Sequence, residues 1–233
     1  MFCGVRFDFS DGATVEEDSD GFVLPLPENI ETGFVSSTFK EFYDCVQPKL
    51  SSLVGRYDEL WLSYANITKQ CDDLEAYKAF DLRAVESGGQ TKYIAYPRKD
   101  EDLTVVSIGI AGAILQKAVK TIDLDAFLAD EIGKQRIDVV LINSDENQYA
   151  VLEQIHSDGA LDRKKVKICQ MNVEVHKETY TDAQKFHDFV WKILNDKRYI
   201  LMKSTFIHSN ERQVIRLLLV NIADKECTDL FSS

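Results

Sequence analysis

The sequence lacks the features that would assign it at once to membrane, secreted or metal-binding proteins. No apolar run reaches the roughly 18 residues that a membrane-spanning helix needs. The opening residues, MFCGVRFDFSDGATVEEDSD, contain no basic segment followed by an apolar one, so we expect no signal peptide. The five cysteines include no CxxC pair, and no two of the four histidines have zinc-like spacing. We therefore expect a soluble chain without a metal site.

Basic residues are also in short supply. The chain has 27 Lys and Arg against 39 Asp and Glu, a formal net charge of -12. A protein that binds nucleic acid needs a basic face to contact the phosphates, so this class is excluded. Much of the negative charge lies in residues 1–35, where eight acids accompany one base, Arg6. We expect this segment to be a flexible acidic arm, and a docking tail for a basic partner is the alternative.

The cysteines are too few and too scattered to predict a disulfide scaffold. Cys169 lies inside an apolar run and is expected to behave as a small buried hydrophobe. Cys45 and Cys71 could pair in an oxidising compartment, and Asn66-Ile67-Thr68 is a formal glycosylation sequon. The compartment of the protein stays open.

What the chain does contain is 45% hydrophobic residues, enough for a packed core. Residues 36–91 are expected to form a helical N-terminal region. Thr38 and Glu41 have the spacing of a capping box, Pro48 is expected to end or bend the first helix, and Gly88-Gly89 indicates a turn. The apolar stripe of that first helix consists of Phe39, Phe42, Tyr43 and Val46.

From residue 92 onward, strands and helices alternate. Runs rich in β-branched residues predict buried strands at 103–110, 137–143 and 166–175. Helices are expected between them, and Thr181 with Gln184 predicts a capping box before another helix. The last two β-rich segments, 199–207 and 214–222, flank a short polar linker and predict an antiparallel hairpin. Residues 92–233 are thus expected to form an α/β domain with a mostly parallel sheet and an antiparallel C-terminal hairpin.

Ligands of such sheets bind beyond the carboxyl ends of the strands. The residues that follow the three predicted parallel strands are 109–112, 143–148 and 174–176. Glu174 and His176 alternate with valines, so both point to one face of their strand. They are the candidate acid and base at this crevice, with ordinary surface hydrogen bonding as the alternative.

In their order, these blocks resemble the FkbM-type family of S-adenosylmethionine-dependent methyltransferases over roughly residues 36–230. The resemblance implies a truncated Rossmann-like methyltransferase fold, S-adenosylmethionine as cofactor, and oxygen methylation of a small molecule or a sugar. It implies that Glu174 and His176 face the acceptor, and that the cofactor is lined by Gly109, Ile110, Ala111, Gly112, Asn143 and Asp145. The blocks that carry the resemblance are TVVSIGIAG, TIDLDAFLADEI, IDVVLINSDENQYAVLEQI, ICQMNVEVH, FHDFVWKIL and RYILMKSTFI.

The chain departs from this family pattern in two places. Where family members read IDIEGAEY, residues 142–149 read INSDENQY, and the amide of Asn143 cannot act as a base. Only eight residues, 113–120, separate Gly112 from Thr121, whereas a βαβ unit needs about 30. The sequence therefore predicts an internal deletion in the cofactor-binding half. Two functions stay open: a methyltransferase, and a non-catalytic pseudoenzyme that binds a protein partner over an open sheet edge.

Overall fold

A computed structural model describes residues 34–87, 90–98, 102–109, 123–143, 148–208 and 212–232. The acidic arm predicted for residues 1–35 therefore lies almost wholly outside the described residues. The N-terminal part contains α1 (Phe34–Ser51), α2 (Tyr57–Lys69), α3 (Glu75–Lys78), β1 (Asp81–Ser87) and β2 (Gln90–Tyr96). The rest contains β3 (Val105–Gly109), α4 (Leu124–Ala126), the π-helical turn η1 (Phe127–Glu131), β4 (Arg136–Asn143), α5 (Gln148–Leu152), α6 (Ala160–Arg163), β5 (Lys167–Lys177), α7 (Tyr180–Asp196), β6 (Tyr199–His208), β7 (Gln213–Asn221) and α8 (Lys225–Phe231).

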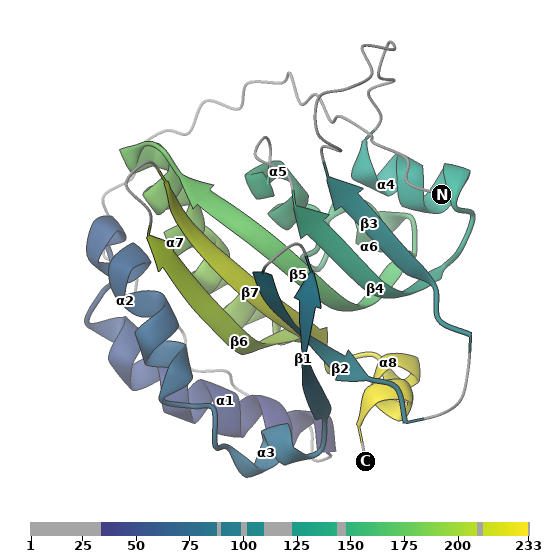
Figure 1. Ribbon diagram of the computed structural model, residues 1–233, viewed down its shortest axis with the longest axis horizontal. Helices are drawn as coiled ribbons and strands as arrows, with labels where there is room; N and C mark the ends of the chain where they lie inside the picture. Colours follow the sequence, from purple (N-terminus) through teal and green to yellow (C-terminus); the bar gives the residue numbers. More distant parts are fainter. Residues whose placement is uncertain are drawn as a thin grey trace.

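The main sheet has five strands in the order β3-β4-β5-β7-β6 (Figure 1). The pairs β3–β4 and β4–β5 are parallel, and the pairs β5–β7 and β7–β6 are antiparallel. The C-terminal hairpin is confirmed, but the expectation of a mostly parallel sheet is wrong. The second strand of the hairpin, β7, lies between β5 and β6. It pairs antiparallel with both, so two of the four strand pairs in the main sheet are antiparallel. The fold is a mixed α/β fold.

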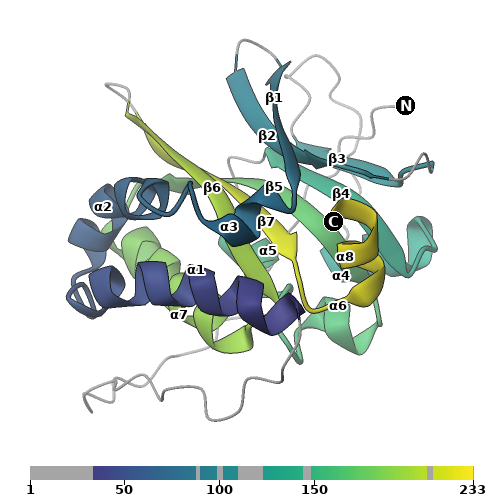
Figure 2. The same cartoon turned by 90° about the horizontal axis from the view of Figure 1, so that it is seen from below.

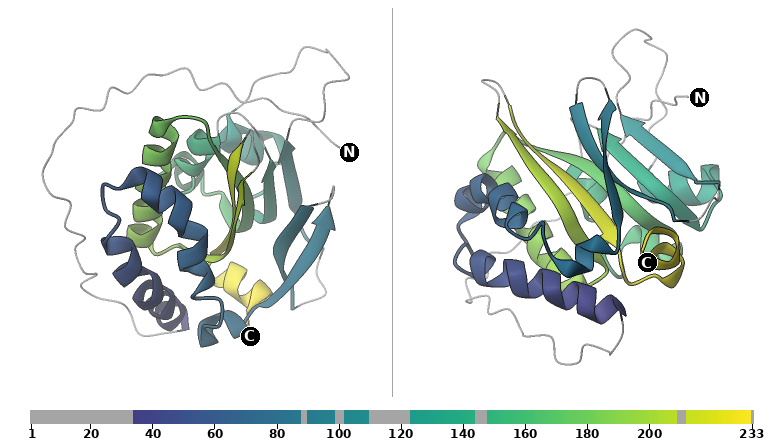
Figure 3. Two further views of the ribbon diagram at one scale, coloured as in Figure 1. Left: turned by 60° about the vertical axis from the view of Figure 1, so that its left-hand side comes forward. Right: turned by 60° about the horizontal axis from the view of Figure 1, so that its bottom comes forward.

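A second, two-stranded sheet covers one face of the main sheet. Strands β1 and β2 pair antiparallel, and they lie on the face opposite α1 and α7 (Figure 2). Figure 3 shows the same separation from two further directions. Gln170 on β5 fixes the contact, because its side-chain amide donates to the backbone carbonyl of Ala95 (2.7 Å) and accepts from its backbone N–H (2.9 Å). Strand β1 falls in the region expected to be helical, so helix there ends at Lys78.

The core lies between the main sheet and the helices. Residues 168–176 of β5 are all buried, as expected for a central strand covered on both faces. On the helical side, Phe186 of α7 makes edge contacts with Trp61 and Tyr64 of α2, each with ring centroids 5.0 Å apart. These contacts pack the N-terminal helices onto the same core that supports the sheet.

The helix starts differ from those expected. The capping box predicted for Thr38 and Glu41 does not form, because α1 begins at Phe34 and Thr38 is buried inside this helix. The capping box of α7 is formed by Thr179 and Asp182, two residues before the predicted pair at 181 and 184. The backbone N–H of Asp182 donates to Thr179 Oγ1 (3.3 Å), and the N–H of Thr179 donates to Asp182 Oδ2 (2.8 Å). This exchange satisfies two donors, whereas Gln184 lies inside the helix.

Two disulfides link distant parts of the chain. Cys45 pairs with Cys71, the pairing considered from the sequence, with Cα atoms 6.1 Å apart. Cys169 pairs with Cys227 across 58 residues, so the expectation that it is merely a small buried hydrophobe is wrong. Its partner on α8 could not be identified from spacing alone. In the described ranges, no helix has the length and apolarity of a membrane span, and no group of metal-binding side chains was found.

Candidate functional site

Three of the predicted site residues lie at one edge of the main sheet. Gly109, at the end of β3, is the register partner of Asn143 at the end of β4. Ile142 pairs with Val173 of β5, so Glu174 follows at the same edge. The side chain of Asn143 is exposed there. The parallel half of the sheet thus brings the ends of β3 and β4 to the level of Glu174, whereas β5 continues to Lys177.

The other predicted cofactor residues cannot be placed. Ile110, Ala111 and Gly112 follow β3, and Asp145 follows β4, and all four lie outside the described residues. The short connection 113–120 lies outside them as well. Of the residues predicted to line the cofactor, the structure therefore describes only Gly109 and Asn143.

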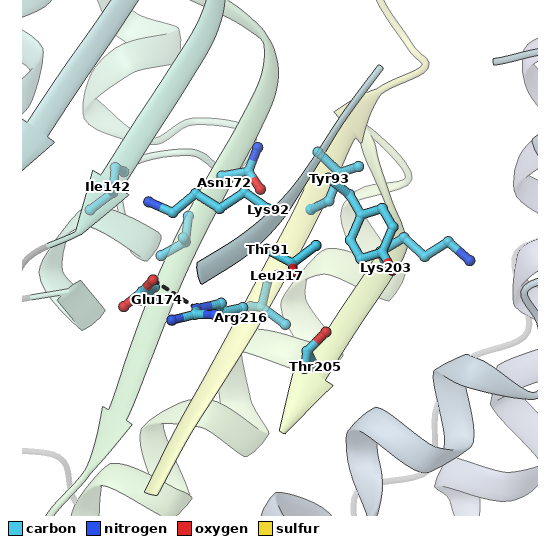
Figure 4. Close-up of a pocket in the computed structure, with 12 residues that line it drawn as sticks. Thr91, Lys92, Tyr93, Ile142, Asn172, Glu174, Lys203, Thr205, Arg216 and Leu217 are labelled. Atoms are coloured by element: carbon cyan, nitrogen blue, oxygen red, sulfur yellow. Dashed lines mark hydrogen bonds and ion pairs between the residues drawn. The ribbon is translucent and has the colours of Figure 1, made fainter. Parts of the chain in front are cut away.

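A small cavity adjoins this edge, between the β1–β2 hairpin and the main sheet (Figure 4). Its volume is about 20 Å³, the space of roughly one water molecule. Glu174 lines it, whereas His176, two residues further along β5, does not. The cavity lining comes from β2, β4, β5, β6 and β7: Thr91, Lys92, Tyr93, Ile142, Asn172, Val173, Glu174, Lys203, Thr205, Arg216, Leu217 and Leu218.

Glu174 forms an ion pair within the sheet. It is the register partner of Arg216 on β7, and Arg216 Nε donates to Glu174 Oε1 at 2.8 Å. The two side chains are 8% and 17% exposed, so each charge is compensated by the other in a largely dry setting. Among the described residues, no hydrogen bond is made to Glu174 Oε2. That oxygen can accept a proton or a hydrogen bond from a group in the cavity.

The cavity also presents several hydrogen-bond donors. Lys92 reaches into it from β2 (Figure 4) and forms no ion pair with any described residue. The buried amide nitrogen Nδ2 of Asn172 has no hydrogen-bond partner in the described part of the chain. Lys203 is engaged, because it pairs with Asp72 (2.7 Å) and lies 5.8 Å from the ring centroid of Tyr93. The lining thus combines one carboxylate with three cations, a set suited to a polar, oxygen-rich group.

His176 has a different environment, beside α5. Its backbone carbonyl accepts hydrogen bonds from Tyr149 Oη (3.0 Å) and Gln148 Nε2 (3.3 Å). Burial, with a smaller contribution from Asp182, raises the pKa of Tyr149, so this hydroxyl stays protonated and keeps donating. These bonds tie the end of β5 to the start of α5.

Lys92, Asn172 and Arg216 were not foreseen as site residues. For Asn172 a signal was available: polar residues occupy every second position of the otherwise apolar β5, at Gln170, Asn172, Glu174 and His176. Polar side chains in a buried strand need partners, so this alternation indicates a polar cluster under a covering layer. Nothing in the local sequence around Lys92 or Arg216 points to the same cavity.

A comparison with known protein families identifies the family of this chain. Residues 80–201 match a family model described as the methyltransferase FkbM domain. The match begins at the foot of β1 and ends in β6, and it contains both the sheet edge and Glu174. No curated protein and no solved structure matches the chain. Since the family match spans just over half of the sequence, the chain belongs to the FkbM methyltransferase family.

Proposed function

We propose that this protein is an FkbM-type, S-adenosylmethionine-dependent methyltransferase that acts on a hydroxyl oxygen of a small molecule or a sugar. The observation that carries the proposal is the register that places Gly109 and Asn143, at the ends of β3 and β4, level with Glu174, which lies three residues before the end of β5. This is the edge at which doubly wound sheets bind nucleotide-like ligands.

The donor set at this edge suits a nucleoside cofactor. Gly109 has no side chain, so a ligand can approach its backbone closely. Asn143 offers both a donor and an acceptor to ribose hydroxyls or to a base. When bound, S-adenosylmethionine supplies an activated methyl group. The family match supports this cofactor, and Asn143 stands where the family pattern has an acid.

The chain's own residues would prepare the acceptor. Glu174 Oε2 would take the proton of the acceptor hydroxyl, while Arg216 holds the other carboxylate oxygen in place. Lys92 and the free amide of Asn172 would donate hydrogen bonds to neighbouring oxygens of the acceptor. Because the cavity has about 20 Å³, it admits a hydroxyl-sized group only, and the rest of the acceptor would lie outside it.

A second candidate is a non-catalytic pseudoenzyme that binds a protein. The eight-residue connection 113–120 favours it, because a complete cofactor-binding unit does not fit there. The edge strand β3 favours it too: among the described strands it pairs only with β4, and Val105 on it is 54% exposed. An exposed edge strand is a template for pairing with another chain.

Photolabelling with radioactive S-adenosylmethionine distinguishes the two candidates. The methyltransferase proposal predicts labelling of the full chain that unlabelled S-adenosylmethionine prevents. It also predicts at least a fivefold lower labelling of Asn143→Ala, with unchanged labelling of the control Asn195→Ala, an exposed asparagine on α7. Lack of competable labelling in the unaltered chain would overturn the donor site and leave the pseudoenzyme.

A further inference from the structure

Helix α2 presents a formal acceptor for N-linked glycosylation on its outer face. Asn66-Ile67-Thr68 is the only Asn-X-Ser/Thr sequence in the 233 residues. Asn66 is exposed, while the residues on either side of it, Ala65 and Ile67, are buried. The asparagine side chain therefore points away from the core, where a bulky glycan can be carried without disturbing packing.

The two disulfides give an independent indication of the compartment. Cys45–Cys71 joins α1 to the end of α2, and Cys169–Cys227 joins β5 to α8. Disulfides form and persist in oxidising compartments and are rare where thiol reductants are abundant. The same compartments in eukaryotic cells attach glycans to asparagine.

An exposed apolar side chain lies next to the acceptor. Leu62 is 53% exposed on α2, four residues before Asn66 and therefore on the same helix face. Side chains of a helix lean toward its N-terminus, so a group attached to Asn66 extends over Leu62. A large apolar side chain left open by the fold is thus placed where a glycan would cover it.

Against the expectation of no signal peptide drawn from the opening residues, we propose that Asn66 carries an N-linked glycan, attached in an oxidising secretory compartment, and that this glycan covers Leu62. The donor is a lipid-linked oligosaccharide diphosphate. The amide nitrogen of Asn66 bonds to the anomeric carbon, the bond from this carbon to the phosphate oxygen breaks, and the amide proton leaves as the lipid diphosphate is released. This inference is independent of the proposed methyl transfer.

The structure also fixes when the transfer occurs. The hydroxyl of Thr68, which the transferase must engage, is buried in the folded protein and hydrogen-bonded to Ser204 of β6. Its single proton lies within reach of two backbone carbonyls one turn back, those of Tyr64 and Ala65 (3.1 Å each), which leaves Ser204 as the donor in the contact between the two hydroxyls. The hydroxyl is therefore occupied once α2 packs on β6. The glycan is added to the nascent chain, before this packing.

The experiment directs the full chain through the secretory route of cultured eukaryotic cells behind a cleavable leader. Digestion with peptide N-glycosidase F is expected to increase the electrophoretic mobility of the chain by one step. Asn66→Gln is expected to migrate like the digested chain, whereas Thr68→Ser and the control Asn195→Gln keep the shift. A mobility that the glycosidase leaves unchanged would overturn the proposal.

The same digestion in ¹⁸O-water is applied to the protein isolated from the cells that naturally make it. Two results together support the proposal. Asn66 is converted to isotope-labelled aspartate, and the four disulfide cysteines react with an alkylating reagent only after reduction. An Asn66 peptide found only unmodified would overturn it for the natural protein.

Discussion

The buried ion pair between Glu174 and Arg216 makes a quantitative prediction. Arg216→Met removes the cation and leaves the carboxylate of Glu174, 8% exposed, without its hydrogen-bonded partner. Methionine fills a similar volume, so the change tests charge more than packing. The variant should unfold at a lower urea concentration than the unaltered protein.

The size of the loss follows from the geometry. At 2.8 Å and an effective dielectric constant of about 20, the attraction between the two charges is about 6 kcal/mol. Much of this offsets the cost of removing both ions from water. Deleting one partner of a buried pair leaves that cost uncompensated and typically destabilises by about 3–5 kcal/mol. We expect Arg216→Met to lower the free energy of unfolding by that amount.

Urea unfolding near neutral pH, followed by fluorescence of the buried Trp61 and Trp191, measures this loss. The control is Arg83→Met, because Arg83 pairs with Asp81 at 55% and 45% exposure, so solvent screens the two charges and the loss of this pair should shift the urea midpoint far less. The double variant Glu174→Leu/Arg216→Met should recover most of the lost stability. If Arg216→Met costs no more than Arg83→Met, the pair is not buried and compensated as described.

Three further predictions concern the hairpin, one histidine and one disulfide. Gln170→Leu removes both bonds to the buried backbone of Ala95, so we expect a loss of about 2–4 kcal/mol and faster amide exchange at Ala95; unchanged exchange would contradict this. Burial lowers the pKa of His156, so stability is full above about pH 6.5 and falls as the pH drops through the folded-state pKa. His156→Phe should flatten that decline in urea midpoints, and an equal slope in both proteins would refute it. Cys169→Ser with Cys227→Ser opens a link across 58 residues and should cost about 4 kcal/mol of unfolding free energy, a loss that an unchanged midpoint would exclude.

Local patterns in the sequence were sufficient to predict the strands of the main sheet, whereas β1 falls in the region expected to be helical. The β-branched runs at 103–110, 137–143 and 166–175 correspond to β3, β4 and β5 within two residues at each end. Strands β6 and β7 follow the predicted hairpin equally well. These runs are decisive because a buried strand needs continuous apolar sequence, whatever its neighbours are.

The order of the strands required information that local patterns do not carry. The position of β7 between β5 and β6 depends on which strand edge of β5 is still unpaired when the C-terminal hairpin joins the sheet. The contact of Gln170 with Ala95 spans 75 residues, and the pair of Glu174 with Arg216 spans 42. Such pairings are set by the packed core and have no signature in sequence spacing.

The candidate site was predictable from the sequence only in part. The rule for parallel strands places Gly109 beside Asn143, and the register confirms this neighbourhood. The same rule could not distinguish Glu174, which reaches a cavity, from His176 two residues later, which does not. The cavity also depends on β2, which contributes Thr91, Lys92 and Tyr93 to its lining from a distant part of the chain.

Isothermal titration of the full, oxidised chain with S-adenosylmethionine tests the central claim most directly. A sheet edge that holds this cofactor at Gly109 and Asn143 should bind it with a dissociation constant in the micromolar range, and Asn143→Ala should weaken binding about tenfold, which is the effect of losing one to two hydrogen bonds. No heat of binding at millimolar cofactor would contradict the claim.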